Sequence, residues 1–258
     1  MTMPCVRFLP ILLLALAAGP AAAQPPAPGQ SPPDVIALVR ADRWAEAQAA
    51  AAGYPDPVAG KLVTYYRLLA PNAAGTAEIA AFMASSPDWP QQATLARRRD
   101  EALAGEPDDS VALAECDRTP AKAAAALLRC AETYDRAGRP GDSAAMARRA
   151  WISDVTDPAW EARFLMGFGT VIGRDDQWRR FDRLAWTDTA SAARQASRLD
   201  PADRARAEAR LAFRRDDPNA PALLAAVPES QRADPGLFLD QARWLRRAGQ
   251  DDAALALW

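Results

Sequence analysis

Proline recurs along the whole chain, and at five places it directly follows an aspartate. The 258 residues include 22 prolines, too many for a few long helices, because a proline inside a helix removes a backbone hydrogen bond. An aspartate before a proline is a helix start signal, since its carboxylate caps free amide groups and proline at the first helical position loses no bond. The five pairs are Asp56-Pro57, Asp157-Pro158, Asp200-Pro201, Asp217-Pro218 and Asp234-Pro235, with Thr119-Pro120 and Pro33-Asp34 as variants. The sequence therefore predicts many short helices.

Apolar residues after Pro33 recur at helical spacing. Leu62, Tyr65, Tyr66 and Leu69, for example, occupy positions i, i+3, i+4 and i+7. Alanine, the best helix former, is abundant, and no stretch alternates in the manner typical of a strand. These patterns predict an all-α fold.

A degenerate repeat is visible around three glycines, which we expect to end helices. Residues 136–144, around Gly138, resemble residues 247–253, around Gly249, and Gly173 lies in a weaker copy. A helix, a glycine turn and a second helix form the unit of an α-solenoid, in which hairpins stack because none buries its apolar face alone. We predict about a dozen short helices in one curved array over residues 34–258; a compact helical bundle is the alternative.

The first 33 residues have the layout of an export signal. Arg7 precedes an apolar run at residues 8–18, and small residues follow at 21–23. The run is too short to span a bilayer, and a core helix is the alternative reading. We interpret residues 1–23 as a signal peptide and residues 24–33 as a proline-rich linker. The chain is then expected to be exported and soluble, without a membrane anchor after cleavage.

Composition excludes several kinds of chemistry. Histidine is absent, which removes Ser-His-Asp and Cys-His catalysis and histidine-ligated metals. A net charge of −2 and a pI near 5.4 give no electrostatic reason to bind nucleic acid. Cys116 and Cys130 remain after signal cleavage, so a disulfide between them is possible in an oxidising compartment; two buried thiols are the alternative.

No grouping of polar residues predicts an active site. We interpret Glu115, Glu132 and Glu161 as residues of solvated helix faces, and we assign no catalytic residue, cofactor or metal ligand. The arginine clusters are best explained as solvated faces paired with neighbours such as Asp203, Glu208 and Asp216, or else as a surface for an anionic polymer. The clusters are Arg97 to Arg99, the set Arg204, Arg206, Arg210, Arg214 and Arg215, and the set Arg243, Arg246 and Arg247. The spacing of Trp160, Trp178, Trp186 and Trp244 favours packing in the core over sugar stacking.

Several segments, in the same order, resemble the soluble lytic murein transglycosylases of Gram-negative bacteria. The resemblance rests on Phe-Met-Ala-Ser-Ser-Pro-Asp-Trp-Pro at residues 82–90 and Asp-Pro-Ala-Trp-Glu-Ala-Arg-Phe at residues 157–164. It continues through residues 173–176, 180–186, 199–215 and 225–247, and spans roughly residues 34–258. It implies a periplasmic, U-shaped α-superhelix of short helical hairpins, TPR-like in architecture. In that family a lysozyme-like domain cleaves the MurNAc–GlcNAc bond of peptidoglycan.

This sequence departs from the family in one respect. It lacks the lysozyme-like domain with its Glu-Ser and Gly-Leu-Met-Gln motifs, and residues 251–258 begin a helix without a cap, which indicates truncation. We therefore expect the non-catalytic superhelical region of a cell-wall enzyme, inactive alone, which holds peptidoglycan or partner enzymes. A stand-alone periplasmic scaffold that binds a protein is the alternative hypothesis.

Overall fold

The computed structural model describes residues 34–153 and 155–258, and the regular structure in them is helical throughout. The α-helices are α1 (Val35–Arg40), α2 (Trp44–Ala51), α3 (Val58–Leu69), α4 (Thr76–Ser85), α5 (Gln92–Ala104), α6 (Asp109–Arg118), α7 (Ala124–Arg136), α8 (Pro140–Ile152), α9 (Pro158–Phe168), α10 (Arg174–Thr187), α11 (Thr189–Ala196), α12 (Pro201–Arg214), α13 (Ala220–Ala225), α14 (Pro235–Arg247) and α15 (Asp251–Ala256). Two short 3₁₀ helices, η1 (Gly169–Val171) and η2 (Glu229–Gln231), follow α9 and α13. The all-α prediction is confirmed for this part of the chain, with more and shorter helices than expected.

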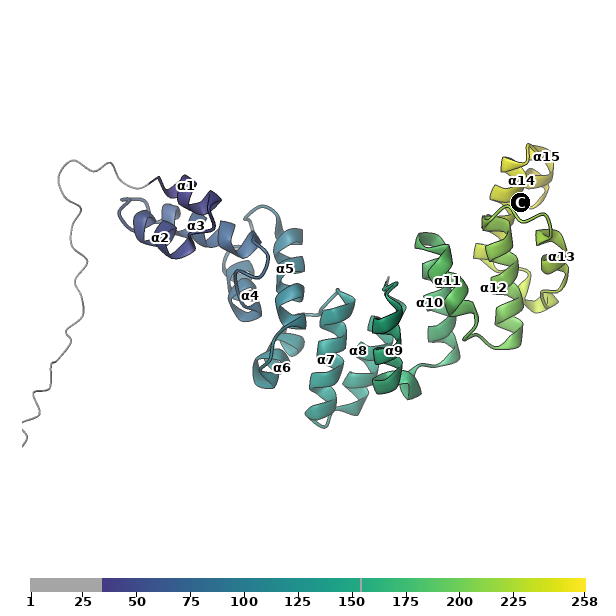
Figure 1. The fold of residues 1–258 in the computed structure, drawn as a ribbon, viewed down its shortest axis with the longest axis horizontal. Coiled ribbons are helices and arrows are strands. Elements are labelled where there is room, and N and C mark those ends of the chain that lie inside the picture. Colours follow the sequence, from purple (N-terminus) through teal and green to yellow (C-terminus); the bar gives the residue numbers. More distant parts are fainter. Residues whose placement is uncertain (1–33, 154) are drawn as a thin grey trace, which may run out of the picture.

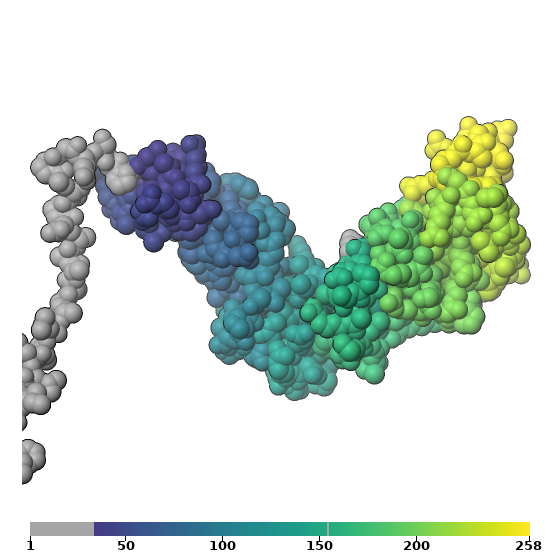
Figure 2. Space-filling model, viewed as in Figure 1, coloured from purple at the N-terminus to yellow at the C-terminus, as the bar shows by residue number. Residues whose placement is uncertain are grey.

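The helices follow one another along an elongated, bent arc. Figure 1 shows one arm built by α1 to α5, a base around α6 to α9, and a second arm that ends at α14 and α15. Figure 2 shows a wide hollow between the two arms. Most principal contacts join neighbouring helices, as in α7 with α8, or helices two places apart, as in α5 with α7, α8 with α10 and α12 with α14. Segments far apart in the sequence therefore stay far apart in space.

The aspartate–proline signals behave in two ways. Asp157, Asp200 and Asp234 are N-caps of α9, α12 and α14, and each carboxylate accepts a hydrogen bond from a first-turn amide, as predicted. Asp56 and Asp217 instead cap a turn, with hydrogen bonds of 2.8 Å from the amides two residues later, and α3 and α13 begin after it. Asp34 caps α1 through the amides of residues 36 and 37.

The prediction that Thr119-Pro120 starts a helix is wrong. Thr119 is the C-cap of α6, and α7 begins at Ala124. The buried carboxylate of Asp100 on α5 caps α7 from a distance, since its Oδ2 accepts hydrogen bonds from the amides of Lys122 (2.8 Å) and Ala123 (2.9 Å). A cap supplied by another helix leaves no signal in the local sequence.

Two of the three repeat glycines end helices, and the third starts one. Gly138 and Gly249 adopt φ of 71° and 73° just after α7 and α14, the left-handed conformation that glycine adopts without strain. Gly173 has φ of −89° and precedes α10, where Asp176 accepts its amide hydrogen bond at 3.0 Å. The expectation that Gly173 ends a helix is therefore wrong, because the following aspartate caps a helix start.

Buried side chains of the described residues form separate clusters spaced along the arc. One joins α3, α4 and α5 around Leu68, a central one joins α5 to α9 around Trp151, and one joins α12 to α14 around Phe213. Arginines connect different helices by donating hydrogen bonds to main-chain oxygens at or near helix C-termini. Arg98 donates to the carbonyl of Leu69 at 2.8 Å, and Arg180 donates to that of Trp151 at 2.6 Å. These donors satisfy carbonyls that a helix end leaves without partners.

Two predictions concern residues outside this description. The proposed signal peptide (1–23) and linker (24–33) lie outside the described residues. No helix in residues 34–153 or 155–258 combines the length and the apolar character that a membrane span requires.

Candidate functional site: charged and aromatic clusters

Two of the glutamates expected on solvated faces are buried. Glu115 on α6 is 2% exposed and Glu161 on α9 is 1% exposed, whereas Glu132 on α7 is partly buried. Arg118 pairs with Glu115 one turn away. The interpretation of Glu115 and Glu161 as solvated is therefore wrong. Glu115 is buried although its partner Arg118 is exposed, and Glu161 is buried together with Arg180 of the next helix.

Glu161 is the centre of a buried ionic cluster. Its Oε1 accepts a hydrogen bond from Arg180 at 2.8 Å, its Oε2 accepts one from Arg198 at 3.0 Å, and Arg194 approaches within 3.6 Å. Burial lowers the pKa of Arg180, although the hydrogen bond that Arg180 donates to Glu161 acts in the opposite direction. The Arg180 guanidinium also lies 4.2 Å from the ring centroid of Trp151. Since arginines occupy both carboxylate oxygens, the cluster joins α9, α10 and α11 and leaves Glu161 no free oxygen for a substrate.

A second buried cluster lies around Arg210 on α12. Arg210 Nε donates to Asp240 on α14 at 2.9 Å, and Arg210 Nη1 donates to Asp182 on α10 at 2.5 Å. Although burial opposes the charge, these hydrogen bonds raise the pKa of Arg210. Gly236 makes room for this guanidinium, because a Cβ there would lie 2.4 Å from its central carbon. One arginine thus connects three successive helices.

The predicted arginine clusters divide between the surface and the interior. Arg97 and Arg98 pair with Glu101 on their own helix, at 2.8 and 2.6 Å, as the solvated interpretation expects. Arg99, the next residue, is buried and donates to Asp100 at 2.7 Å. Among the expected partners, Asp203 pairs with Arg206 at 2.8 Å and Asp216 pairs with Arg247 at 2.7 Å. Two of the expected aspartates thus pair with arginines of the clusters, but Asp203 is buried and Arg247 lies on another helix than Asp216, so the solvated interpretation is wrong for Asp203.

Three of the four tryptophans expected in the core are partly buried, and arginines cover two of the four. Trp160, Trp178 and Trp244 are partly buried, and the guanidinium of Arg206 lies 3.3 Å from the ring centroid of Trp178. Trp186 is 39% exposed, so the prediction that it packs in the core is wrong. It lies near the C-terminal end of α10, where arginines of α12 and α14 lie against its ring. The exposed part of Trp186 is therefore accessible to a ligand.

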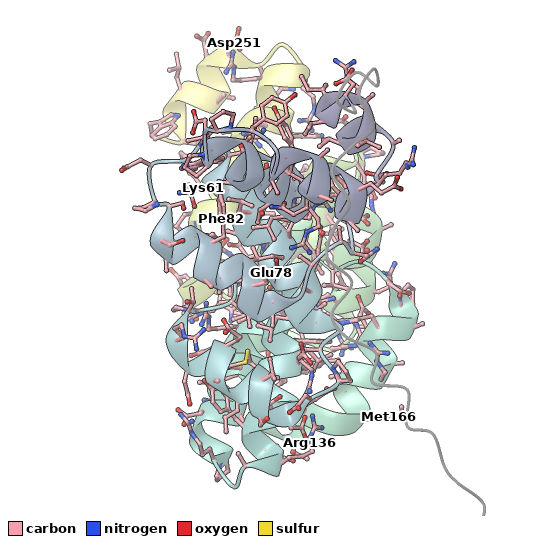
Figure 3. The ribbon with its side chains drawn as sticks, turned by 90° about the vertical axis from the view of Figure 1, so that its left-hand side faces the viewer. Lys61, Glu78, Phe82, Arg136, Met166 and Asp251 are labelled. Atoms are coloured by element: carbon pink, nitrogen blue, oxygen red, sulfur yellow. A yellow bond between two sulfur atoms is a disulfide. The ribbon has the colours of Figure 1, made fainter. Side chains whose placement is uncertain are left out.

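Aromatic residues also gather in the N-terminal arm. Tyr65 of α3 lies 5.0 Å from Trp89 between ring centroids and 6.0 Å from Phe82 of α4. The exposed Lys61 lies beside them, as Figure 3 shows for Phe82, with its Nζ 4.9 Å from the Trp89 ring centroid.

Figure 3 also shows Met166, which is 83% exposed, at the end of the molecule opposite Asp251, and so on the outer side of the bend in Figure 1.

Several surface grooves are large enough to receive a ligand or a peptide segment, and two of them illustrate the range of their walls. One, of about 540 Å³, has mainly apolar walls from α1, α3 and the loop before α3, including Ile36, Tyr54 and Tyr66. The other, of about 500 Å³, lies between α11, α12 and α13, with alanines and leucines below a charged rim that includes Arg204 and Glu208. Both are therefore candidates for binding.

Cys116 of α6 and Cys130 of α7 form a disulfide, with 5.8 Å between their Cα atoms.

Residues 34–153 and 155–258 contain no group of three or more Cys, Asp or Glu side chains that could hold a metal ion.

Comparison with protein-family models, with curated proteins and with solved structures finds no match to this chain.

Proposed function

We propose that this chain is the non-catalytic superhelical region of an exported peptidoglycan lytic transglycosylase. In this proposal the helical hairpins form a TPR-like α-superhelix that holds glycan strands or partner enzymes in the periplasm while another domain breaks the glycosidic bond. The observation that carries the proposal is the open arc, in which mainly sequential neighbours pack and a wide hollow lies between the arms. An array of this kind offers an extended concave surface for binding.

The resemblance in sequence supplies the cell-wall context. The segments at residues 82–90 and 157–164 carry it, and the exported location rests on the interpretation of residues 1–23 as a signal peptide. A disulfide between Cys116 and Cys130 is compatible with that location, because disulfides persist in oxidising compartments.

Sedimentation with purified cell-wall sacculi tests the proposal. We expect the chain from Gln24 to Trp258 to pellet with intact sacculi, to stay in solution once the sacculi are enzymatically solubilised, and to release no anhydro-muropeptides. A chain that stays in the supernatant contradicts binding to glycan, and release of anhydro products contradicts the non-catalytic role.

The alternative function is a stand-alone periplasmic scaffold for a protein partner. The apolar groove around Ile36, Tyr54 and Tyr66 favours it, since apolar walls suit a protein segment better than a polar glycan. Sequencing of the reading frame past Trp258 separates the two hypotheses. A frame that continues into a lysozyme-like domain supports the first, and a stop codon supports the second.

A further inference from the structure

A small, positively charged cavity lies where α11, α12 and α14 meet. Its volume is about 120 Å³, and its walls are formed by Thr189, Arg214, Asp240, Arg243 and Arg247. Three guanidinium groups and one carboxylate thus face a single space. An excess of cations around a cavity attracts an anionic group, the more strongly because the surrounding protein screens charge less than water does.

The fold already uses much of this charge. The buried Asp240 accepts hydrogen bonds from Arg210 at 2.9 Å and from Arg214 at 2.7 Å, so both its oxygens are engaged. Arg247 pairs with Asp216 at 2.7 Å and donates to the carbonyl of Phe213 at 2.7 Å. These contacts hold the cavity walls in place by joining α12 to α14.

Two donors remain. Within the part of the chain that the structure describes, Arg243 makes no hydrogen bond and no ion pair; its guanidinium lies 4.8 Å from the ring centroid of Trp186. Arg214 lies 5.0 Å from the same centroid, and its Nε is buried without a hydrogen-bond partner. Because this Nε is closed to solvent, the donors open to an anion are the terminal N–H groups of the two guanidinium groups. The ion pair with Asp240 holds the Arg214 guanidinium in place, and the ring of Trp186 lies against both guanidinium groups.

We propose that this cavity binds the carboxylate end group of an organic ligand. A volume of about 120 Å³ holds several water molecules but is well below the ~300 Å³ of sites that enclose a whole small molecule. A guanidinium presents a planar fork of donors that matches a carboxylate. Trp186 does not line the cavity, but it is 39% exposed and its ring lies against the two guanidinium groups. It therefore offers an apolar surface beside them to a ligand that extends out of the cavity, which favours an organic carboxylate over an inorganic oxyanion. Its source is either a peptide C-terminus or an acidic side chain.

This inference goes beyond the proposed scaffold function, because it assigns a ligand chemistry to one place on the molecule. It applies equally to a peptide attached to a glycan and to a protein partner. Its test uses small soluble probes and not sacculi, so failure of the sedimentation experiment and failure of this one are separate results.

Calorimetric titration of the intact chain with acetyl-dialanine tests the proposal. We expect saturable binding that weakens as salt is added, and no binding of the matched C-terminal amide, which has the same shape without the charge. Acetyl-glutamate α-amide presents a side-chain carboxylate instead, and the tighter of the two carboxylates identifies the source. Arg243→Gln should weaken binding at least about tenfold, because it removes a charged donor. Arg243→Lys keeps the charge without the fork and should give an intermediate affinity.

Arg246→Gln is the matched control. Arg246 is also exposed on α14. It lines a cavity near α15 that Arg243 borders as well, but it does not line the cavity proposed here, so this variant should bind as the unmodified chain does. Circular dichroism checks that the variants are folded. The proposal is overturned if the amide binds as tightly as the acid, if inorganic phosphate binds more tightly than both carboxylates, if Arg243→Gln has no effect, or if neither carboxylate binds at about 10 mM.

Discussion

At the scale of single residues, buried arginines connect successive helices. Arg180 is fully buried between Trp151 and Glu161, and its neighbour Arg179 is exposed on the same helix. Arg180→Met should lower the free energy of unfolding by about 3–5 kcal/mol, because it leaves the Glu161 carboxylate buried with weaker compensation. Urea denaturation followed by circular dichroism measures the change. Arg179→Met is the control and should change stability by less than about 0.5 kcal/mol; equal effects of the two substitutions would contradict the role of Arg180.

Tyr134 should make stability depend on pH in the alkaline range. Burial, together with its hydrogen bond to Asp117 at 3.0 Å, raises the pKa of Tyr134 to about 12. A phenol in the unfolded chain has a pKa of about 10. The folded state therefore holds this proton more tightly, so the contribution to stability is complete below pH ~10 and is lost as pH rises through about 12. Urea midpoints measured across this range should fall less steeply for Tyr134→Phe than for the unmodified chain. The same substitution at the exposed Tyr54 should leave the slope unchanged.

Three adjacent arginines differ in burial in a way that the sequence does not indicate. Arg97, Arg98 and Arg99 are chemically identical neighbours, and the sequence pattern predicted that all three lie on a solvated helix face. Only the rotation of α5 against α7 decides that Arg99 is buried beside Asp100. Helical periodicity requires an apolar signal, and a buried arginine with a partner on another helix removes that signal.

At the scale of helices, glycine turns fix where one helix ends and the next begins. Gly138 adopts φ of 71° between α7 and α8, and Gly141, three residues later, lies inside α8 without positive φ and with open space around its Cα. Gly138→Ala should therefore lower stability by roughly 1 kcal/mol, whereas Gly141→Ala should be neutral or stabilising by up to about 1 kcal/mol. Thermal unfolding of the two variants tests this contrast; a stabilising Gly138→Ala would show that the turn does not require the left-handed conformation.

The disulfide fastens α6 to α7. Its two cysteines are 14 residues apart, and a loop of that length predicts a stabilisation of roughly 2–4 kcal/mol. The unmodified chain should lose stability in reductant, while the Cys116→Ala, Cys130→Ala double variant should be less stable throughout and insensitive to reductant. Alkylation of the unreduced, denatured protein gives an independent measurement. Mass spectrometry that finds Cys116 and Cys130 alkylated would contradict the bond.

Helix starts were predictable where the aspartate before a proline is itself the N-cap. Asp157, Asp200 and Asp234 cap the helices that they precede, and the sequence places those starts correctly. The start of α7 was missed because Asp100 caps it from α5. Some helix ends were missed because Asp216 adopts φ of 57° after α12, where the pattern expects a glycine. Asp and Asn tolerate this conformation better than most residues do, so a turn is possible without glycine.

At the scale of the whole molecule, the sequence predicted all-helical structure but not the candidate carboxylate cavity. Heptad-like apolar faces and repeated start signals are local, and they indicate short helices directly. The cavity instead combines Thr189 of α11, Arg214 of α12 and Arg243 of α14, and Trp186 of α10 lies against the last two. Its formation depends on how successive helices pack, and no spacing within one helix indicates that arrangement.

The separate hydrophobic clusters predict that the two arms open independently. Phe213 belongs to the cluster of α12, α13 and α14, and Leu68 belongs to the cluster of α3, α4 and α5; these clusters share no residue. Phe213→Ala should destabilise its own cluster by about 3–5 kcal/mol and Leu68→Ala its own by about 2–5 kcal/mol, because each leaves a cavity. Hydrogen exchange followed by mass spectrometry should show faster exchange in α12 to α14 for the first variant, with α3 to α5 unchanged, and the reverse for the second. In an array in which units contact mainly their neighbours, loss of one interface does not open distant ones. Faster exchange over the whole chain in either variant would instead indicate a single cooperative core.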